Sequence, residues 1–129
     1  LREVRRLTGF RGRWTILGRR PLVVCDTGHN EAGIPFITGQ LARLPQRRLH
    51  FVLGVVNDKD VSKMLALLPR HATYYFCQAS IPRALPAEEL AARAAAAGLN
   101  GQAYGPVPVA VAAARAAAAP DEVVFIGGS

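Results

Sequence analysis

The sequence of 129 residues predicts an open, doubly wound α/β domain. We expect a mostly parallel six-stranded sheet with one antiparallel strand and helices on both faces. The alternation of patterns along the chain favours this class. Short apolar runs alternate with segments whose apolar residues recur at helical spacing, and such alternation is typical of parallel sheets with right-handed crossovers. The length suits one domain with a buried core, so residues 1–129 are expected to form a single domain.

The first strand is expected to run against the others. Leu1–Leu7 carries apolar residues at helical spacing, and Arg13–Gly18 has the pattern of a strand. A tight turn at 18–21 leads into a second strand at 22–26, a run of four apolar residues that ends at Asp26. Because a connection this short joins antiparallel neighbours, these two strands should pair antiparallel.

The remainder of the chain alternates between helix and strand patterns. Apolar spacing predicts helices at 34–44, 61–68, 87–97 and 108–118. Apolar runs predict strands at 49–55, 72–77, 102–104 and 122–126. The last helix is rich in alanine, and we interpret this as close packing on the sheet, because small side chains let a helix approach it.

The charge of +7 is concentrated at one end of the chain. Residues 1–20 hold seven arginines and one glutamate, whereas the other 109 residues are nearly neutral. A basic segment can bind nucleic acid or any other phosphate, or simply face solvent. Only Phe10 and Trp14 accompany these arginines, which weakens the case for a single-strand stacking platform. No apolar run reaches the roughly 20 residues that span a membrane, and the two cysteines are typical of a reduced, cytoplasmic protein.

Polar residues follow the predicted strands where a doubly wound sheet binds its ligands, at the carboxyl ends of the strands. They are Asp26, His29, Asn30, Asp58, Lys59, Asp60, Arg83 and Ser129. A carboxylate at the position of Asp26 can accept hydrogen bonds from two adjacent sugar hydroxyls. Asp26 and Asn30 can equally cap the following helix, because Asp and Asn are good N-caps.

Several catalytic signatures are absent from the sequence. It has no phosphate-binding P-loop and no Gly-x-Gly-x-x-Gly after a strand. Its histidines (His29, His50 and His71) lack metal-ligand spacing with the cysteines, and His50 and His71 are expected to be structural or solvated. Ser129 has no nucleophile-elbow context. We therefore expect no catalytic residue and no metal ligand in this domain, which resembles half of an active site.

The segment Asp26-Thr27-Gly28-His29-Asn30 resembles the Asp-x-Ala-His-Asn motif in the C-terminal domain of the Mur ligase family. More closely, the chain resembles the C-terminal domain of folylpolyglutamate synthase/dihydrofolate synthase. The supporting motifs occur in family order across essentially the whole chain: Gly12-Arg13-Trp14, Gly54-x-x-x-Asp58-Lys59-Asp60, Pro82-Arg83-Ala84-Leu85-Pro86 and Gly127-Gly128-Ser129. The chain departs from the pattern at Gly28, where Ala is usual, and at Glu31, where Pro is common.

The resemblance implies a cytoplasmic ligase that uses ATP to add L-glutamate to folate or dihydropteroate through an acyl phosphate. It places the P-loop and the Mg²⁺ ligands in a larger N-terminal ATPase domain that is absent from this chain. Asp26 would hold the ATP ribose with His29 and Asn30 beside it, and Arg13 would reach the phosphates. Lys59 would bind the glutamate carboxylate, with Ser129 in the same pocket, and Arg83 would also contact substrate.

Other functions remain open on the sequence alone. One is a different Mur-type ligase, such as a peptidoglycan-precursor enzyme. Another is a non-catalytic module that binds nucleic acid through the basic N-terminal segment. The third is a structural domain whose polar edge is merely solvated.

Overall fold

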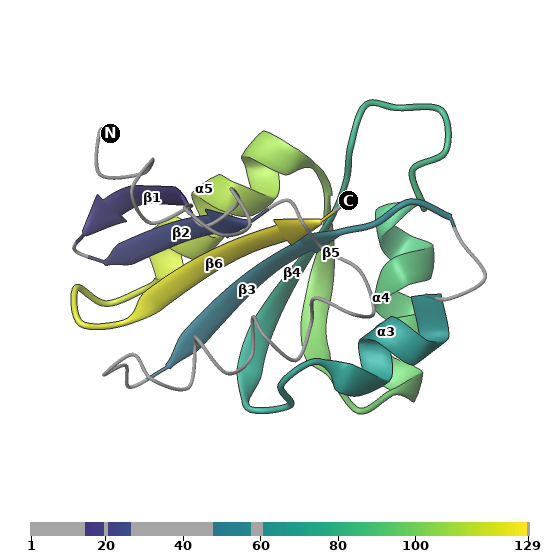
Figure 1. Ribbon diagram of the computed structural model, residues 1–129, viewed down its shortest axis with the longest axis horizontal. Coiled ribbons are helices and arrows are strands. Elements are labelled where there is room, and N and C mark those ends of the chain that lie inside the picture. Colours follow the sequence, from purple (N-terminus) through teal and green to yellow (C-terminus); the bar gives the residue numbers. More distant parts are fainter. Residues whose placement is uncertain (1–14, 20, 27–47, 58–60, 129) are drawn as a thin grey trace.

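The computed structural model describes residues 15–19, 21–26, 48–57 and 61–128 (Figure 1). Its centre is a six-stranded sheet in the order β1-β2-β6-β3-β4-β5. The strands are β1 (Thr15–Arg19), β2 (Leu22–Asp26), β3 (Leu49–Gly54), β4 (Ala72–Gln78), β5 (Asn100–Pro106) and β6 (Val123–Gly128). The described helices are α3 (Val61–Leu67), α4 (Ala87–Ala96) and α5 (Val107–Ala117).

The sheet has the predicted mixture of strand directions. β1 pairs antiparallel with β2, and every other pair is parallel. The fold class and the antiparallel first strand are therefore confirmed. β5 is longer than the predicted 102–104, because its ends pair with β4 through residues without an apolar pattern. The patterns at Leu1–Leu7 and 34–44 lie outside the described residues.

Helices cover both faces of the sheet (Figure 1). One face carries a core in which α3 and α4 pack on alternate residues of β3, β4 and β6. Its centre is aromatic: the Phe51 ring stacks on Tyr74 at 5.0 Å and meets Phe125 edge-on at 4.9 Å between ring centroids. Rings offset in this way attract beyond their area of burial. Among the described residues, no helix combines the length and apolar character that crossing a membrane requires.

On the other face, α5 lies close to the sheet. Its Ala110 and Ala114 are fully buried against a second core that includes Val52, Tyr75 and Val124. A methyl group at these two positions lets the helix backbone approach the strands, whereas a larger side chain would hold it away. The alanine-rich sequence is therefore a packing surface, as predicted.

A buried polar cluster ties β3, β4 and the segment before β6 together at the amino ends of the strands. His50 is only 1% exposed. Its Nδ1 lies 2.8 Å from the Tyr75 hydroxyl, and its Nε2 lies 2.7 Å from Oε1 of Glu122. Neutral His50 satisfies both contacts when Nε2–H donates to the carboxylate and Nδ1 accepts from the hydroxyl. The prediction that His50 is structural is therefore confirmed, and His71 is exposed.

The surroundings of Glu122 favour its charged form. The backbone N–H of Ala119 donates to Oε1 at 3.0 Å, and this bond is the main reason that the pKa of Glu122 is lowered. The hydrogen bond from His50 lowers the pKa further. In the same cluster, burial is the main reason that the pKa of the Tyr75 hydroxyl is raised.

Replacing Glu122 by Gln should destabilise the domain most at neutral pH. The pKa of Glu122 is lower in the folded state. Its stabilising contribution is thus complete above the unfolded value, about 4.3, and disappears as the pH falls through the folded value. The difference in unfolding free energy between parent and Glu122→Gln should therefore stay constant from pH 7 to about pH 5 and shrink as the pH falls further in urea titrations. Glu88→Gln, an exposed change on α4, is the control. A pH-independent difference would contradict this assignment.

Candidate functional site

A continuous row of backbone pairings crosses the carboxyl edge of the sheet. The last residue of β2, Asp26, pairs with Gly127 of β6. The next residue of β6, Gly128, pairs with Gly54 at the end of β3. Three neighbouring glycines therefore follow Asp26 along this edge. Because glycine has no side chain, a ligand can approach the backbone closely there.

The row continues beyond the sheet through a short bridge between two loops. Val56, after β3, pairs antiparallel with Ala84, after β4. On either side of this pair, the Asn57 N–H donates to the Arg83 carbonyl at 2.6 Å, and the Leu85 N–H donates to the Val55 carbonyl at 2.9 Å. The two loops that follow β3 and β4 are thereby joined into one unit.

The structure places only part of the predicted site. Arg83 is exposed, on the loop that the bridge holds. Asp26 ends β2 at the same edge, so residues far apart in the sequence share it. The remaining predicted site residues lie outside the described ranges: Arg13, His29, Asn30, Lys59 and Ser129. Their roles stay predictions, as do those of Asp58 and Asp60.

Sequence reasoning missed the pairing of Asn57 with Arg83. The two residues are 26 positions apart, and no local pattern signals an isolated bridge between loops. The only available hint was the position of Leu85, an apolar residue within a polar loop. Leu85 is fully buried, which is what anchors the second loop.

Gly54 has a steric role that its position in the sequence motif did not reveal. A Cβ at Gly54 would lie 3.0 Å from Sγ and 3.1 Å from the carbonyl oxygen of Cys77. A side chain at Gly54 would require Cys77 to shift by a few tenths of an ångström, so glycine suits the close approach of the β3 and β4 ends. Burial raises the pKa of the Cys77 thiol to about 11, so this thiol is neutral at physiological pH and has a packing role.

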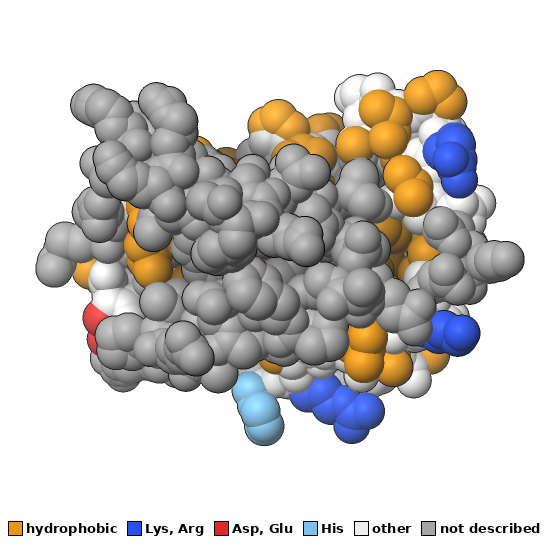
Figure 2. Space-filling view, in the orientation of Figure 1, with side chains coloured by type: hydrophobic (Ala, Val, Ile, Leu, Met, Phe, Trp, Pro, Cys, Tyr) orange, Lys and Arg blue, Asp and Glu red, His pale blue; other side chains and the backbone are white. Residues whose placement is uncertain are grey.

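Described cationic side chains are prominent near α3 on one face of the molecule. On the face shown in Figure 2, described Lys and Arg side chains gather on that side and near the loop after β4, and described acidic ones lie at the opposite end. The exposed cations there include Lys63, Arg70 and Arg83. Long-range attraction of this kind steers anionic ligands.

The described edge suits the hydroxyls and anionic groups of a nucleotide or an amino acid. Its glycine backbone and the exposed guanidinium of Arg83 match such groups. No cluster of three or more His, Cys, Asp or Glu side chains that could hold a metal ion occurs within the described ranges.

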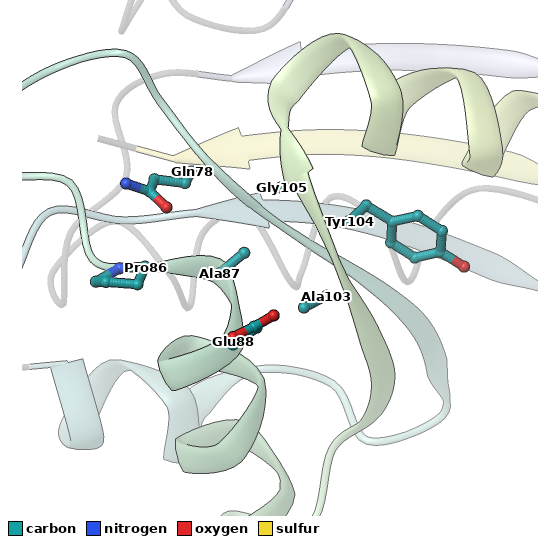
Figure 3. Close-up of a pocket in the computed structure, with 7 residues that line it drawn as sticks. All are labelled: Gln78, Pro86, Ala87, Glu88, Ala103, Tyr104 and Gly105. Atoms are coloured by element: carbon teal, nitrogen blue, oxygen red, sulfur yellow. The ribbon is translucent and has the colours of Figure 1, made fainter.

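A pocket of about 500 Å³ opens beside the bridge, between the end of β5 and the first turn of α4 (Figure 3). It is lined by Gln78, Pro86, Ala87, Glu88, Ala103, Tyr104 and Gly105. Figure 3 shows the Tyr104 ring pointing away from Gln78 and Glu88. Gln78 and Glu88 carry polar side chains in this lining, and neither was predicted as a site residue.

Comparison with known proteins gives one family. Residues 12–129 match the family described as Mur ligase, glutamate ligase domain. The dihydrofolate synthase/folylpolyglutamate synthase of Escherichia coli is 32% identical over 92% of this chain. The chain spans only 14% to 28% of the length of the curated relatives it matches.

Solved structures agree with the sequence match. The structure described as E. coli FolC in complex with DHPP and ADP has a TM-score of 0.82 and 31% identity. The match covers 93% of this chain and 28% of that one. A bifunctional folylpolyglutamate synthase/dihydrofolate synthase with Mn, AMPPNP and L-glutamate bound has a TM-score of 0.81 and 26% identity. It covers 93% of this chain and 29% of that one.

Gly54→Ala should destabilise the domain, because the new methyl group must displace Cys77. We expect a loss of about 1–3 kcal/mol of unfolding free energy, which is typical of overpacking in a well-packed region. Gly18→Ala is the matched control, because the nearest atom to its Cβ would be 3.5 Å away, an ordinary contact. Urea unfolding of both variants measures the difference. Equal stabilities for the two would show that the β3 and β4 ends tolerate separation.

Proposed function

Because the chain belongs to the family of Mur ligase glutamate ligase domains, we propose that it is the C-terminal domain of a folylpolyglutamate synthase/dihydrofolate synthase. Such an enzyme is an ATP-dependent ligase that adds L-glutamate to folate or dihydropteroate. The observation that carries the proposal is the row of backbone pairings from Asp26 to Arg83, since it gathers the motif-bearing strand ends at one edge. The names of the relatives support this ligase over a peptidoglycan-precursor enzyme.

The proposed chemistry joins an amine to a carboxylate. ATP supplies the phosphoryl group that activates the carboxylate of the folate or dihydropteroate. The amine of L-glutamate then attacks the activated carbonyl carbon, and phosphate leaves. The part of this domain is to bind, to orient and to exclude water, which would otherwise hydrolyse the activated group.

Each predicted site residue receives a role in this proposal. Asp26 holds the ribose, since a carboxylate accepts strong hydrogen bonds from two hydroxyls. His29 and Asn30 follow it closely in the sequence, and Arg13 binds the phosphates. The glutamate is bound by Lys59, Arg83 and Ser129. Arg83 has structural support, because its exposed side chain extends from a loop fixed to β3.

The remaining parts belong to a larger N-terminal ATPase domain in the proposed ligase. The chain has no P-loop in its sequence, and its described residues form no metal-binding cluster. We therefore assign the phosphate-binding loop and the Mg²⁺ ligands to that domain. The cytoplasm, as the compartment of folate metabolism, is part of the same proposal.

The first test of this function compares the chain alone with the longer ligase that we propose contains it. The longer protein should incorporate L-glutamate into folate or dihydropteroate in an ATP-dependent manner, followed with radiolabelled glutamate. The 129 residues alone should have no ATP turnover, because they lack the P-loop. A screen that includes peptidoglycan precursors separates the two ligase classes. ATP hydrolysis by the chain alone, at rates typical of ligases, would contradict the assignment of the ATPase to another domain.

A second test concerns Asp26, whose role as a ribose ligand competes with a role as a helix cap. Asp26→Asn keeps the capping ability, because Asn caps about as well as Asp. If Asp26 binds the ribose, the ligase variant should melt normally but use ATP less well, by roughly 1–3 kcal/mol in kcat/KM for ATP.

The control for this test is the same measurement with 2′-deoxy-ATP. Removing the 2′-hydroxyl should lower kcat/KM by a smaller factor in Asp26→Asn than in the parent, because the Asp26 carboxylate and this hydroxyl interact. Equal penalties in both proteins would leave Asp26 as a helix cap.

A further inference from the structure

The bridge between the two loops places Asn57 and Arg83 opposite each other. Val56 and Ala84 form its central pair, and the backbone hydrogen bond from Asn57 to Arg83 closes it on the solvent side. Residues opposite each other on antiparallel segments have Cβ atoms roughly 4.5–5.5 Å apart. Both Asn57 and Arg83 are exposed, so an amide and a guanidinium extend from adjacent backbone positions.

We propose that Asn57 and Arg83 together bind one carboxylate of the amino-acid substrate, which makes Asn57 a specificity-determining residue of the ligase. This inference rests on the proposed function and deepens it. Arg83 offers a planar fork that suits a carboxylate, and the Asn57 amide adds two N–H donors. A carboxylate has about four acceptor positions, enough for both side chains.

The positive charge of the exposed Arg83 side chain can contact a ligand. Across the ranges that the structure describes, no acidic side chain forms an ion pair with Arg83. The residue opposite Arg83 is a neutral amide, whereas an aspartate there would compete with the substrate for the guanidinium. Within the described ranges, a neutral residue opposite Arg83 therefore leaves its guanidinium able to recognise an anion.

The backbone beneath the two side chains is fixed in advance. On the core side of the bridge, Val55 and Leu85 are both buried and belong to the same hydrophobic core. The hydrogen bond from Leu85 to Val55 joins them. Gly54, the residue before Val55, pairs with Gly128 at the end of β6. A binding site held by core contacts loses less conformational freedom when a ligand arrives.

The decisive variant is Asn57→Asp in the longer ligase. The new carboxylate neutralises Arg83 and repels the substrate, so the KM for L-glutamate should rise about tenfold or more. The KM for ATP and the melting temperature should stay close to the parent values. Asn100→Asp is the matched control, because it makes the same change at an exposed position where β5 begins, at the opposite edge of the sheet. It should leave the KM for glutamate unchanged.

A second measurement asks whether the two residues act on the same group. Asn57→Ala and Arg83→Gln should each raise the KM for glutamate, and the double variant should raise it by less than the product of the two. Independent effects that multiply, an unchanged KM in Asn57→Asp, or an equal rise in Asn100→Asp would each overturn the inference.

The failure of this inference can be distinguished from the failure of the proposed function. If the parent ligates glutamate and Asn57→Asp does not alter its KM, only the inference is wrong. If the parent ligates no glutamate, the proposed function is wrong, and the inference is judged by NMR on the 129-residue chain. The amide signals of Asn57 and Arg83 should then shift with L-glutamate and not with its dimethyl ester. Unchanged signals would overturn the inference too.

Discussion

The insertion of β6 between β2 and β3 is the constraint on which the rest of the structure depends. β6 is last in the sequence but central in the sheet, and it pairs in parallel with both neighbours. Its Val124 and Phe125 are fully buried, one in each core. Before β6 docks, β2 has no connection to β3 within the sheet, so the edge that carries Asp26 and the bridge cannot exist. The candidate site is thus a product of long-range pairing, completed by the last described strand.

Glycines lie where β6 and β3 end at the carboxyl edge of the sheet. Gly127 and Gly128 of β6 lie beside Asp26 and Gly54, and Gly54 lies against Cys77 of β4. A side chain at Gly54 would push the strands apart. Side chains at Gly127 and Gly128 would extend into the edge that we propose a ligand occupies. Glycine therefore allows Gly54 to pack on Cys77, and it leaves the edge bare for the ligand that we propose.

The sequence predicted the bounds of single helices and strands, but it missed contacts between segments that are distant in the chain. Apolar runs placed β2 and β4 to within a residue, and helical spacing placed α4 and α5, because burial on a sheet leaves a period in the sequence. The central place of β6, the bridge at Val56 and the hydrogen bonds of His50 depend on segments brought together by folding. Arg83 and Asp26 were predicted from motifs, and the structure adds that backbone pairings connect them. The role that we propose for Asn57 had no signal in the sequence.

The two ends of the strands carry polar groups of different kinds. The amino ends hold the cluster of His50, Tyr75 and Glu122, whose hydrogen bonds join β3, β4 and the segment before β6. The carboxyl ends hold bare glycine backbone, an exposed guanidinium and an amide. Buried, satisfied polar groups rigidify a fold, while exposed donors remain available to a ligand. Because the strands between them are fixed by two cores, titration of the amino edge should alter stability without reshaping the carboxyl edge. The pH dependence that we expect from Glu122 and the anion recognition that we propose for Arg83 therefore lie at opposite edges of the sheet.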